Sequence, residues 1–310
     1  MNNSQNNVTA GLRARLDGSI STVVTDATVL VVGLGSGGSQ TVEALVRSSV
    51  KNLIVIDMDE VDLVNLSRSV YDAADVGVPK TEAITRRMQA INPDVTIEGK
   101  RCALDDIDPA ELAQMVSRAD LVVAATDDPS AQARLNRVAW HSGVPAVFAG
   151  VYEKGAAGEV IFTIPGVTTC FRCATGGVRG DRRGTAQINY GTGQLVAEPA
   201  LGADITHVVS ASVKVALGLI ELGDKQAWGN SSAALVLSAA ASSRNFLQMS
   251  TVPNWDYFPQ VFTNTPGQHG YQSVWLGTNR NPECPVCGDN PVLDGTDAAP
   301  DLTALRLMDG

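Results

Sequence analysis

The sequence has little that would place it on nucleic acid or in a membrane. Among 310 residues, 23 Lys and Arg stand against 33 Asp and Glu, a net charge of −10. Without a clustered basic face to neutralise phosphates, bulk nucleic-acid binding is excluded. The best apolar run, residues 208–222, is interrupted by Lys214 and Glu221 and is too short for a membrane span. The first ten residues lack the charged start and apolar stretch of a secretory signal, so we expect a cytoplasmic protein.

Cysteine is also scarce, with five in the whole chain. In a reducing compartment such residues serve metal binding or chemistry more often than disulfides. Four of them form two C-x-x-C pairs, Cys170 with Cys173 and Cys284 with Cys287, and each pair can present two thiolates to one tetrahedral ion. The pairs are about 110 residues apart, far outside a compact zinc-finger spacing, so a redox pair or unconnected core cysteines stay open. The fifth, Cys102, is interpreted as a small core residue.

What the sequence does have is an alternation of apolar runs and helical patterns. This alternation predicts an α/β fold with a doubly wound, Rossmann-like, mainly parallel sheet. An additional antiparallel part is expected after Gly150, where the runs become shorter and one long helix is predicted at 205–222. The predicted strands are 29–32, 53–56, 95–97, 121–125, 146–149, 159–164 and 233–238, and the shorter helices include 80–91 and 129–141, with a further helix starting at Pro109.

The chain is predicted to form one domain over 29–288, preceded by an extension (1–28) and followed by an acidic tail (289–310). Two segments interrupt the domain. A Gly- and Arg-rich crossing loop is expected at about 175–199, and residues 251–280 hold six of the fifteen aromatic side chains. This aromatic insert is either a surface that recognises a substrate protein or a satellite core.

A glycine-rich turn follows the first predicted strand. Gly33, Gly35 and Gly38 fit G-x-G-x-x-G, which lets the backbone N–H groups at a helix N-terminus approach phosphate. Asp57 lies at the end of the second predicted strand, 19 residues after Gly38, where a carboxylate can accept hydrogen bonds from ribose hydroxyls. The pattern predicts a nucleotide site, by default for NAD or FAD; the alternative is that the glycines only allow close packing of helix against strand.

Polar residues beyond Asp57 favour a triphosphate over a dinucleotide. Asn65, Arg68 and Lys80 are donors suited to phosphate oxygens, and Asp127 directly follows the fourth strand, where a carboxylate can hold Mg²⁺. Each of these residues alone is more often a solvated surface group. Their shared position at strand ends and in the adjoining loops indicates one site.

Several ordered segments together resemble the ThiF/MoeB/HesA superfamily of ubiquitin-activating-enzyme-like adenylyltransferases. The resemblance implies that the C-terminal carboxylate of a ubiquitin-like or sulfur-carrier protein, or of a peptide, attacks the α-phosphate of ATP, giving an acyl-adenylate and pyrophosphate. It also implies a homodimer and a structural zinc at the four paired cysteines. The segments are 29–38, 56–59, 65–68, 76–80 and 125–128.

The resemblance implies roles for individual residues. Asn65, Arg68, Lys80 and Asp127 would be catalytic, with Asp127 also binding Mg²⁺. The implied cofactor-binding residues for ATP comprise these four and a further set in the glycine turn and after the second strand: Gly33, Gly35, Gly37, Gly38, Asp57 and Asp59.

One departure from the family pattern and one feature of the crossing loop bear on mechanism. Many members carry an N-terminal arginine motif that reaches the partner subunit's ATP, and this chain offers only Arg13 or Arg15. Some members form a thioester on a crossing-loop cysteine, and residues 175–199 contain none, so we expect adenylation without a thioester. The alternatives are a peptide-modifying adenylase, a tRNA-modifying dehydratase, an NAD-binding oxidoreductase and an inactive binding scaffold.

Overall fold

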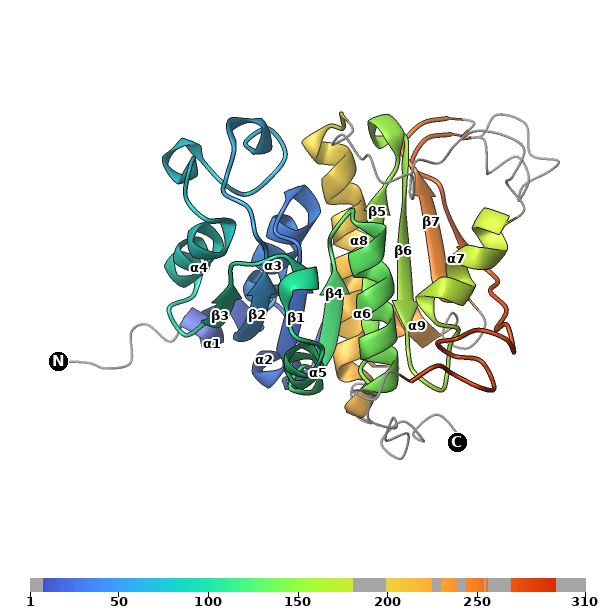
Figure 1. The fold of residues 1–310 in the computed structure, drawn as a ribbon. Helices are drawn as coiled ribbons and strands as arrows, with labels where there is room; N and C mark the ends of the chain where they lie inside the picture. Colours follow the sequence, from blue (N-terminus) through green and yellow to red (C-terminus); the bar gives the residue numbers. More distant parts are fainter. Residues whose placement is uncertain are drawn as a thin grey trace.

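The computed structural model describes residues 8–180, 199–224, 230–238, 244–253, 255 and 269–293. Within these ranges the strands form one eight-stranded sheet in the order β3-β2-β1-β4-β5-β6-β7-β8, and Figure 1 shows the first seven from left to right. The strands are β1 Thr28–Val32, β2 Asn52–Ile56, β3 Thr96–Lys100, β4 Leu121–Ala124, β5 Ala146–Val151, β6 Ala157–Thr163, β7 Phe246–Ser250 and β8 Ser273–Leu276.

The first five strands form the predicted parallel half of the sheet. Val29 of β1 pairs with Leu53 of β2 and with Leu121 of β4, so β1 lies in the centre. Its side chains alternate between two apolar clusters, with Val29 and Val31 in one and Leu30 and Val32 in the other. A strand buried on both faces is continuously apolar, which explains why these runs predicted their strands well. Strand β3 lies at the edge, is mostly exposed, and runs three residues beyond its predicted end.

The remaining strands are antiparallel, as expected, but their identity differs from the prediction. Strands β5 to β8 pair antiparallel, and β7 and β8 were not predicted. The segment 233–238, predicted as a strand, is helix α9 (Ser232–Ser238). Ala233, Ala234 and Leu237 are buried while Leu235 is 51% exposed, which is helical spacing. A short apolar run does not distinguish the two structures, and here packing against α8 decides.

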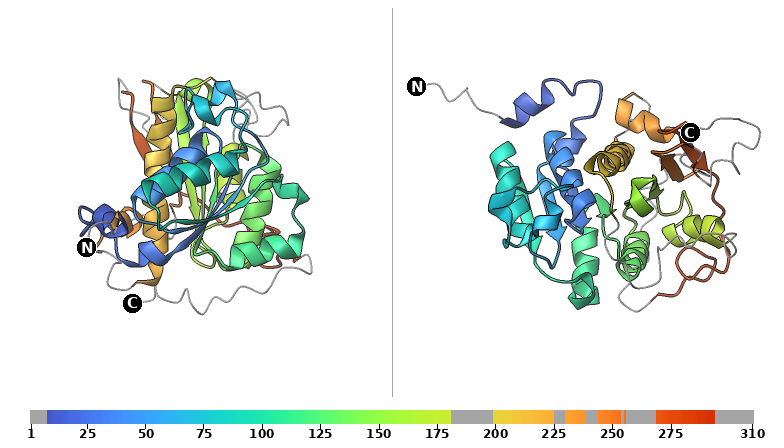
Figure 2. Two further views of the ribbon diagram at one scale, coloured as in Figure 1. Left: turned by 90° about the vertical axis from the view of Figure 1, so that its left-hand side faces the viewer. Right: turned by 90° about the horizontal axis from the view of Figure 1, so that it is seen from above.

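Helices cover both faces of the sheet (Figure 2). Helices α3 (Ser36–Arg47), α4 (Lys80–Ile91) and α8 (Gly202–Ile220) contribute to one apolar cluster, and α5 (Pro109–Ser117), α6 (Pro129–His141) and α7 (Phe171–Gly180) to the other. The sequence run 208–222 was judged too short for a membrane span, but it is part of a longer segment, Gly202–Gly223, that is long and apolar enough to cross a membrane. Because 67% of its apolar window is buried inside the protein, it is placed as a core helix is.

Some of the predicted segment boundaries differ from those in the structure. The crossing loop was expected from about 175, but α7 continues to Gly180, and 181–198 lie outside the described residues. Strand β8 lies within the aromatic insert, of which 254 and 256–268 are not described. The N-terminal extension contains helices α1 (Val8–Arg13) and α2 (Val23–Asp26), and of the acidic tail only 289–293 are described.

Candidate active site

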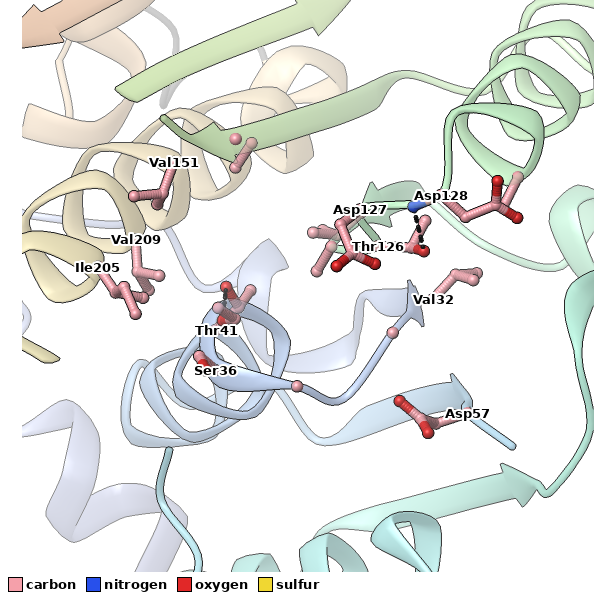
Figure 3. Close-up of a pocket in the computed structure, with 18 of the residues that line it drawn as sticks. Val32, Ser36, Thr41, Asp57, Thr126, Asp127, Asp128, Val151, Ile205 and Val209 are labelled. Carbon is pink, nitrogen blue, oxygen red and sulfur yellow. Dashed lines mark hydrogen bonds between the residues drawn. The ribbon is translucent and has the colours of Figure 1, made fainter. Parts of the chain in front are cut away.

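A cavity of about 770 Å³ opens at the carboxyl ends of the parallel strands. The chain crosses from β3 to β4 on the other side of β1, so β1 and β4 form the switch point at which open α/β sheets bind ligands. The residues labelled in Figure 3 come from β1, α3, the end of β2, the loop after β4, β5 and α8. The cavity wall contains all but one of the predicted nucleotide-site residues: Gly33, Gly35, Gly37, Asp57, Asp59, Asn65, Arg68, Lys80 and Asp127.

Gly38 is the predicted nucleotide-binding residue that does not line the cavity. A Cβ at Gly38 would lie 1.9 Å from the carbonyl oxygen of Gly33, and a Cβ at Gly33 would lie 2.6 Å from that of Ala125. Gly33 also has φ +90°, which a side chain disfavours. Gly35 meets no such neighbour, and it precedes α3, whose N-terminus faces the cavity. The glycines therefore divide between close backbone packing and access of a ligand to the helix N-terminus.

The glycine turn is held in place at Leu34. The Leu34 N–H donates to Oδ2 of Asp57 at 2.6 Å, and the hydroxyl of Tyr71 donates to the Leu34 carbonyl at 2.8 Å. Burial raises the pKa of Tyr71, which keeps the hydroxyl protonated as a donor. Burial also raises the pKa of Asp57, against the lowering effects of Lys80 and the Leu34 and Asp59 N–H groups. Tyr71 was missed from sequence because nothing marks a tyrosine in a connecting loop as a support of the site.

Lys80 lies between two carboxylates at the start of α4. Its Nζ is 2.8 Å from Oδ2 of Asp59 and 3.7 Å from Oδ1 of Asp57, and its side chain is only 8% exposed. An ammonium this buried needs such pairing. Within the same wall, Asn65 accepts a hydrogen bond from the Asp62 N–H through Oδ1, which leaves its amide nitrogen as a donor. The wall also includes Arg68, so three donors face one cavity.

Two adjacent aspartates after β4 have different surroundings. Asp128 caps α6 by accepting a hydrogen bond from the Ser130 N–H at 2.9 Å. Both side chains are exposed and line the cavity (Figure 3), but no hydrogen bond of the Asp127 carboxylate is found among the described residues. Because the capping oxygens are already engaged, Asp127 is the better candidate for a metal carboxylate.

Beyond Asp57 the wall continues into residues that the sequence did not indicate. Met58 and the segment 102–105 line this part of the cavity. Cys102 is half-buried here and also packs at the edge of an apolar cluster, so it is a wall residue as well as the core residue expected. Burial raises its pKa, which disfavours the nucleophilic thiolate. Segment 102–105 follows β3, and the rule that ligands bind at carboxyl ends of strands is the signal that could have found it.

A third region of the wall, here called the far arm, is mostly apolar. Figure 3 shows Val151, Ile205 and Val209 on the opposite side of the view from Asp57, with Ser36, Thr41 and Asp127 between them. A buried Tyr152 stacks on Trp255 with ring centroids 5.8 Å apart, so one aromatic of the insert belongs to this wall. The far arm consists of Ala149, Gly150, Val151, Tyr152, Lys154, Ala156, Ala200, Ile205, Val208, Val209 and Trp255.

Away from the cavity, the four paired cysteines meet in one buried cluster. Their sulfur atoms all lie within 4.8 Å of one another, with Cys170 and Cys284 3.8 Å apart and Cys173 and Cys287 3.5 Å apart. Tetrahedral zinc with bonds of about 2.3 Å separates its sulfur ligands by about 3.8 Å. The donor set and its spacing therefore fit Zn²⁺.

The polypeptide around the cysteines is arranged as metal knuckles are. The Asn281 N–H points at the sulfur of Cys173 and the Val286 N–H at that of Cys284, each at 3.5 Å. A Cβ at Gly288 would lie 2.4 Å from the Cys284 carbonyl oxygen, so glycine is required after Cys287. His141, at the end of α6, lies 3.0 Å from the Val286 carbonyl oxygen. The cluster thus joins the C-terminal segment to α6 and α7.

Comparison with known proteins identifies the family. The model of the ThiF family matches residues 17–286. Ubiquitin-like modifier-activating enzyme 5 of Oryza sativa subsp. japonica is 30% identical over 161 residues, covering 49% of this chain and 38% of that protein. The same enzyme of Drosophila ananassae is 33% identical over 163 residues, covering 49% and 40%. The chain thus spans well under half the length of these relatives.

Solved structures with the same fold include E. coli MccB. The MccB structure with ATP superposes with a TM-score of 0.63 at 18% identity, covering 91% of this chain and 75% of MccB. The structure of MccB with N-formylated MccA, described as a Microcin C7 biosynthetic enzyme, gives 0.61 at 19% identity, covering 86% and 69%. This likeness supports the fold, and the family match covers most of the chain. The chain belongs to the ThiF family.

Proposed function

We propose that this protein is an ATP-dependent adenylyltransferase that activates the C-terminal carboxylate of a ubiquitin-like or sulfur-carrier protein, or of a peptide. The observation that supports this most is the composition of one cavity. It joins a helix N-terminus, Lys80, Arg68 and Asp127 to an apolar far arm. The first set suits phosphate and a metal ion, and the far arm leaves room for an acyl group beside them.

The reaction requires positioning and charge neutralisation more than acid–base chemistry. A carboxylate oxygen attacks the α-phosphorus of ATP, the bond from that phosphorus to the bridging oxygen breaks, and pyrophosphate leaves. No proton is transferred, because the carboxylate is ionised at neutral pH. Asn65, Arg68 and Lys80 would stabilise the charge on the phosphates, and Asp57 would bind ribose while ordering Leu34.

Two metal ions enter the proposal. Mg²⁺ held by Asp127 would neutralise phosphate charge, and this assignment rests on the carboxylate that remains after Asp128 has capped α6. Zn²⁺ held by Cys170, Cys173, Cys284 and Cys287 would be structural, since four protein ligands leave no open position for chemistry.

Other parts of the proposal concern assembly and the fate of the acyl group. We infer a cytoplasmic homodimer in which an N-terminal arginine completes the partner's site. Arg13 donates to Thr25 and Ser49 of its own chain, whereas Arg15 is exposed, so Arg15 is the better candidate. The acyl group would stay on AMP, without a thioester. A reducible thioester on the purified protein would contradict that last step.

ATP–pyrophosphate exchange tests the proposal. Exchange that depends on a ubiquitin-like protein ending in Gly-Gly is expected if the substrate is a protein. Exchange with short peptides alone would assign the chain to peptide modification, the activity suggested by the MccB fold. Binding of NAD with no binding of ATP would reject both and favour an oxidoreductase. Binding of a partner protein without ATP binding or exchange would favour a scaffold.

A further inference from the structure

Lys154 is a cation of the far arm that the family resemblance does not assign. It lies at the tip of the hairpin between β5 and β6 and contributes to the cavity wall. Resting on the proposed function, we propose that Lys154 binds the substrate's C-terminal carboxylate and positions it for attack on the α-phosphate. Lys154 would thus be a binding residue for the acyl substrate, distinct from the residues that hold ATP.

The backbone at Lys154 is unusual for a residue with a side chain. Its φ is +57°, in the left-handed region, and the next residue, Gly155, has φ +67°. Such a conformation costs free energy in L-residues, and at cavity walls it is often retained because it aims a side chain. The strain at this position is therefore an observation that supports function independently of charge.

The surrounding structure holds the hairpin tip in this conformation. Gly155 donates its N–H to the Tyr152 carbonyl at 2.9 Å, which closes the turn. Thr251, just after β7, donates from its backbone to Ala156 at 3.0 Å and from its hydroxyl to Gly155. A Cβ at Gly155 would lie 2.5 Å from Asp204 of α8, so the tip packs closely against that helix. Lys154 is thus presented from a fixed platform.

The apolar character of the far arm creates the need for a cation. A carboxylate that enters among Val151, Val208 and Val209 loses hydration, which is costly without a charged or hydrogen-bonding partner. Among the described residues that form the far arm, Lys154 is the only one with a positively charged side chain. The wall has two other cations: Lys80, which is paired with the carboxylates after β2, and Arg68, which lies beside Gly202 at the start of α8.

The sheet topology places Lys154 at the edge of the sheet where the cavity opens. Strand β5 is the parallel neighbour of β4, and it ends at Val151, so the hairpin tip lies at the same edge as Asp127. An acyl chain in the far arm would therefore place its carboxylate between Lys154 and the phosphates. In an in-line displacement, the attacking carboxylate approaches the α-phosphorus from the side opposite the leaving pyrophosphate. The pyrophosphate would then lie toward the glycine turn.

The test compares a carboxylate with its neutral amide, because general damage to the cavity would weaken both equally. N-acetyl-Gly-Val and its C-terminal amide are titrated by calorimetry against protein loaded with α,β-methylene-ATP. Lys154 is exposed before a ligand enters. We expect the wild type to bind the acid about tenfold more tightly than the amide, because a charge-assisted hydrogen bond to a carboxylate that covers the lysine supplies that difference. In Lys154→Met this preference should fall below about twofold, and Lys154→Arg should retain most of it.

The matched control is Lys214→Met, which removes an exposed lysine of α8 outside the cavity wall and should leave the preference intact. A wild type that binds acid and amide equally, or binds neither at millimolar concentration, would overturn the proposal, as would a preference that survives Lys154→Met. Failure of the adenylation proposal is distinguishable from this one. In that case the Lys154-dependent preference persists although no substrate supports pyrophosphate exchange.

Discussion

The carboxylate of Asp57 accepts a 2.6 Å hydrogen bond from the backbone N–H of Leu34, in the middle of the glycine turn. Asp57 was predicted to bind ribose, and its position in the cavity wall is compatible with that role. The structure adds that the same side chain shapes the turn whose N–H groups face the phosphates. A substitution at Asp57 should therefore weaken binding of the whole nucleotide, including the phosphates, which Asp57 itself would not contact.

Asp57→Asn should weaken ATP binding by about tenfold or more, because a charge-assisted hydrogen bond contributes roughly 1.5–3 kcal/mol. The loss should extend to inorganic tripolyphosphate, which has no ribose, since the turn itself is loosened. Calorimetric titration with both ligands measures the effect. Asp17→Asn, an exposed position, serves as the control. A loss confined to ATP would contradict the role in shaping the turn.

The raised pKa of Asp57 predicts a pH dependence of stability with a definite sign. A carboxyl whose pKa is higher in the folded state than its ordinary 3.8 binds its proton more tightly when folded. Its contribution to the free energy of unfolding therefore decreases as pH rises from about 3.8 to the raised value, then stays constant. Urea unfolding between pH 4 and 7 should show the wild type losing stability relative to Asp57→Asn. The opposite trend would mean that Lys80 outweighs burial.

Glycines of the same turn should respond differently to an added methyl group. Gly38→Ala forces a Cβ to within 1.9 Å of the Gly33 carbonyl oxygen, and the resulting shift should cost about 1–3 kcal/mol of unfolding free energy. Gly35→Ala meets no atom within 4 Å and should cost less than about 1 kcal/mol, as the loss of a modest cap. Urea unfolding measures both. Equal losses would contradict the division of the glycines between packing and access.

The two aspartates after β4 provide another matched pair. Asp127→Ala should abolish ATP–pyrophosphate exchange with little change in melting temperature, because this exposed carboxylate supports no described hydrogen bond. Asp128→Ala should cost about 1 kcal/mol of stability through the lost cap, yet it should retain measurable exchange where Asp127→Ala has none. Near-wild-type turnover in Asp127→Ala would count against the metal assignment.

Sequence reasoning identified the parallel half of the sheet because burial on both faces leaves a continuous apolar run, as in Val29 to Val32. It did not identify β7, where Gln248 and Ser250 are buried at 1% and 0% exposure. Polar side chains in a short run do not resemble a core strand. Their burial depends on the neighbouring strands β6 and β8, which local sequence does not report.

The same limit applies to the site. Motifs indicated Asn65, Arg68 and Asp127 because those residue types act directly on phosphate or metal. Residues that support the site through contacts, such as Tyr71 beneath Leu34, carry no motif. Lys154 and Trp255 reach the cavity from parts of the chain that sequence order places far from the glycine turn, and only the antiparallel pairing brings them there.

The cysteine cluster gives the prediction with the clearest stoichiometry. Protein purified without chelator should contain about one zinc per chain, and Cys284→Ser should lower this strongly, because a tetrahedral site that loses one thiolate binds zinc much less tightly. Melting temperature should fall as well, since the cluster ties the C-terminal segment to α7 and, through His141 and Val286, to α6. Elemental analysis and thermal unfolding measure the two effects.

The control for that experiment is Cys102→Ser, which removes a thiol from the cavity wall and should leave the zinc content unchanged. ATP binding in Cys284→Ser should be affected far less than its melting temperature, because none of the four clustered cysteines lines the cavity. Zinc near zero in the wild type would overturn the structural-metal assignment. If zinc were present but its removal left stability unchanged and stopped exchange, the ion would have to act in the reaction, contrary to a site closed by four protein ligands.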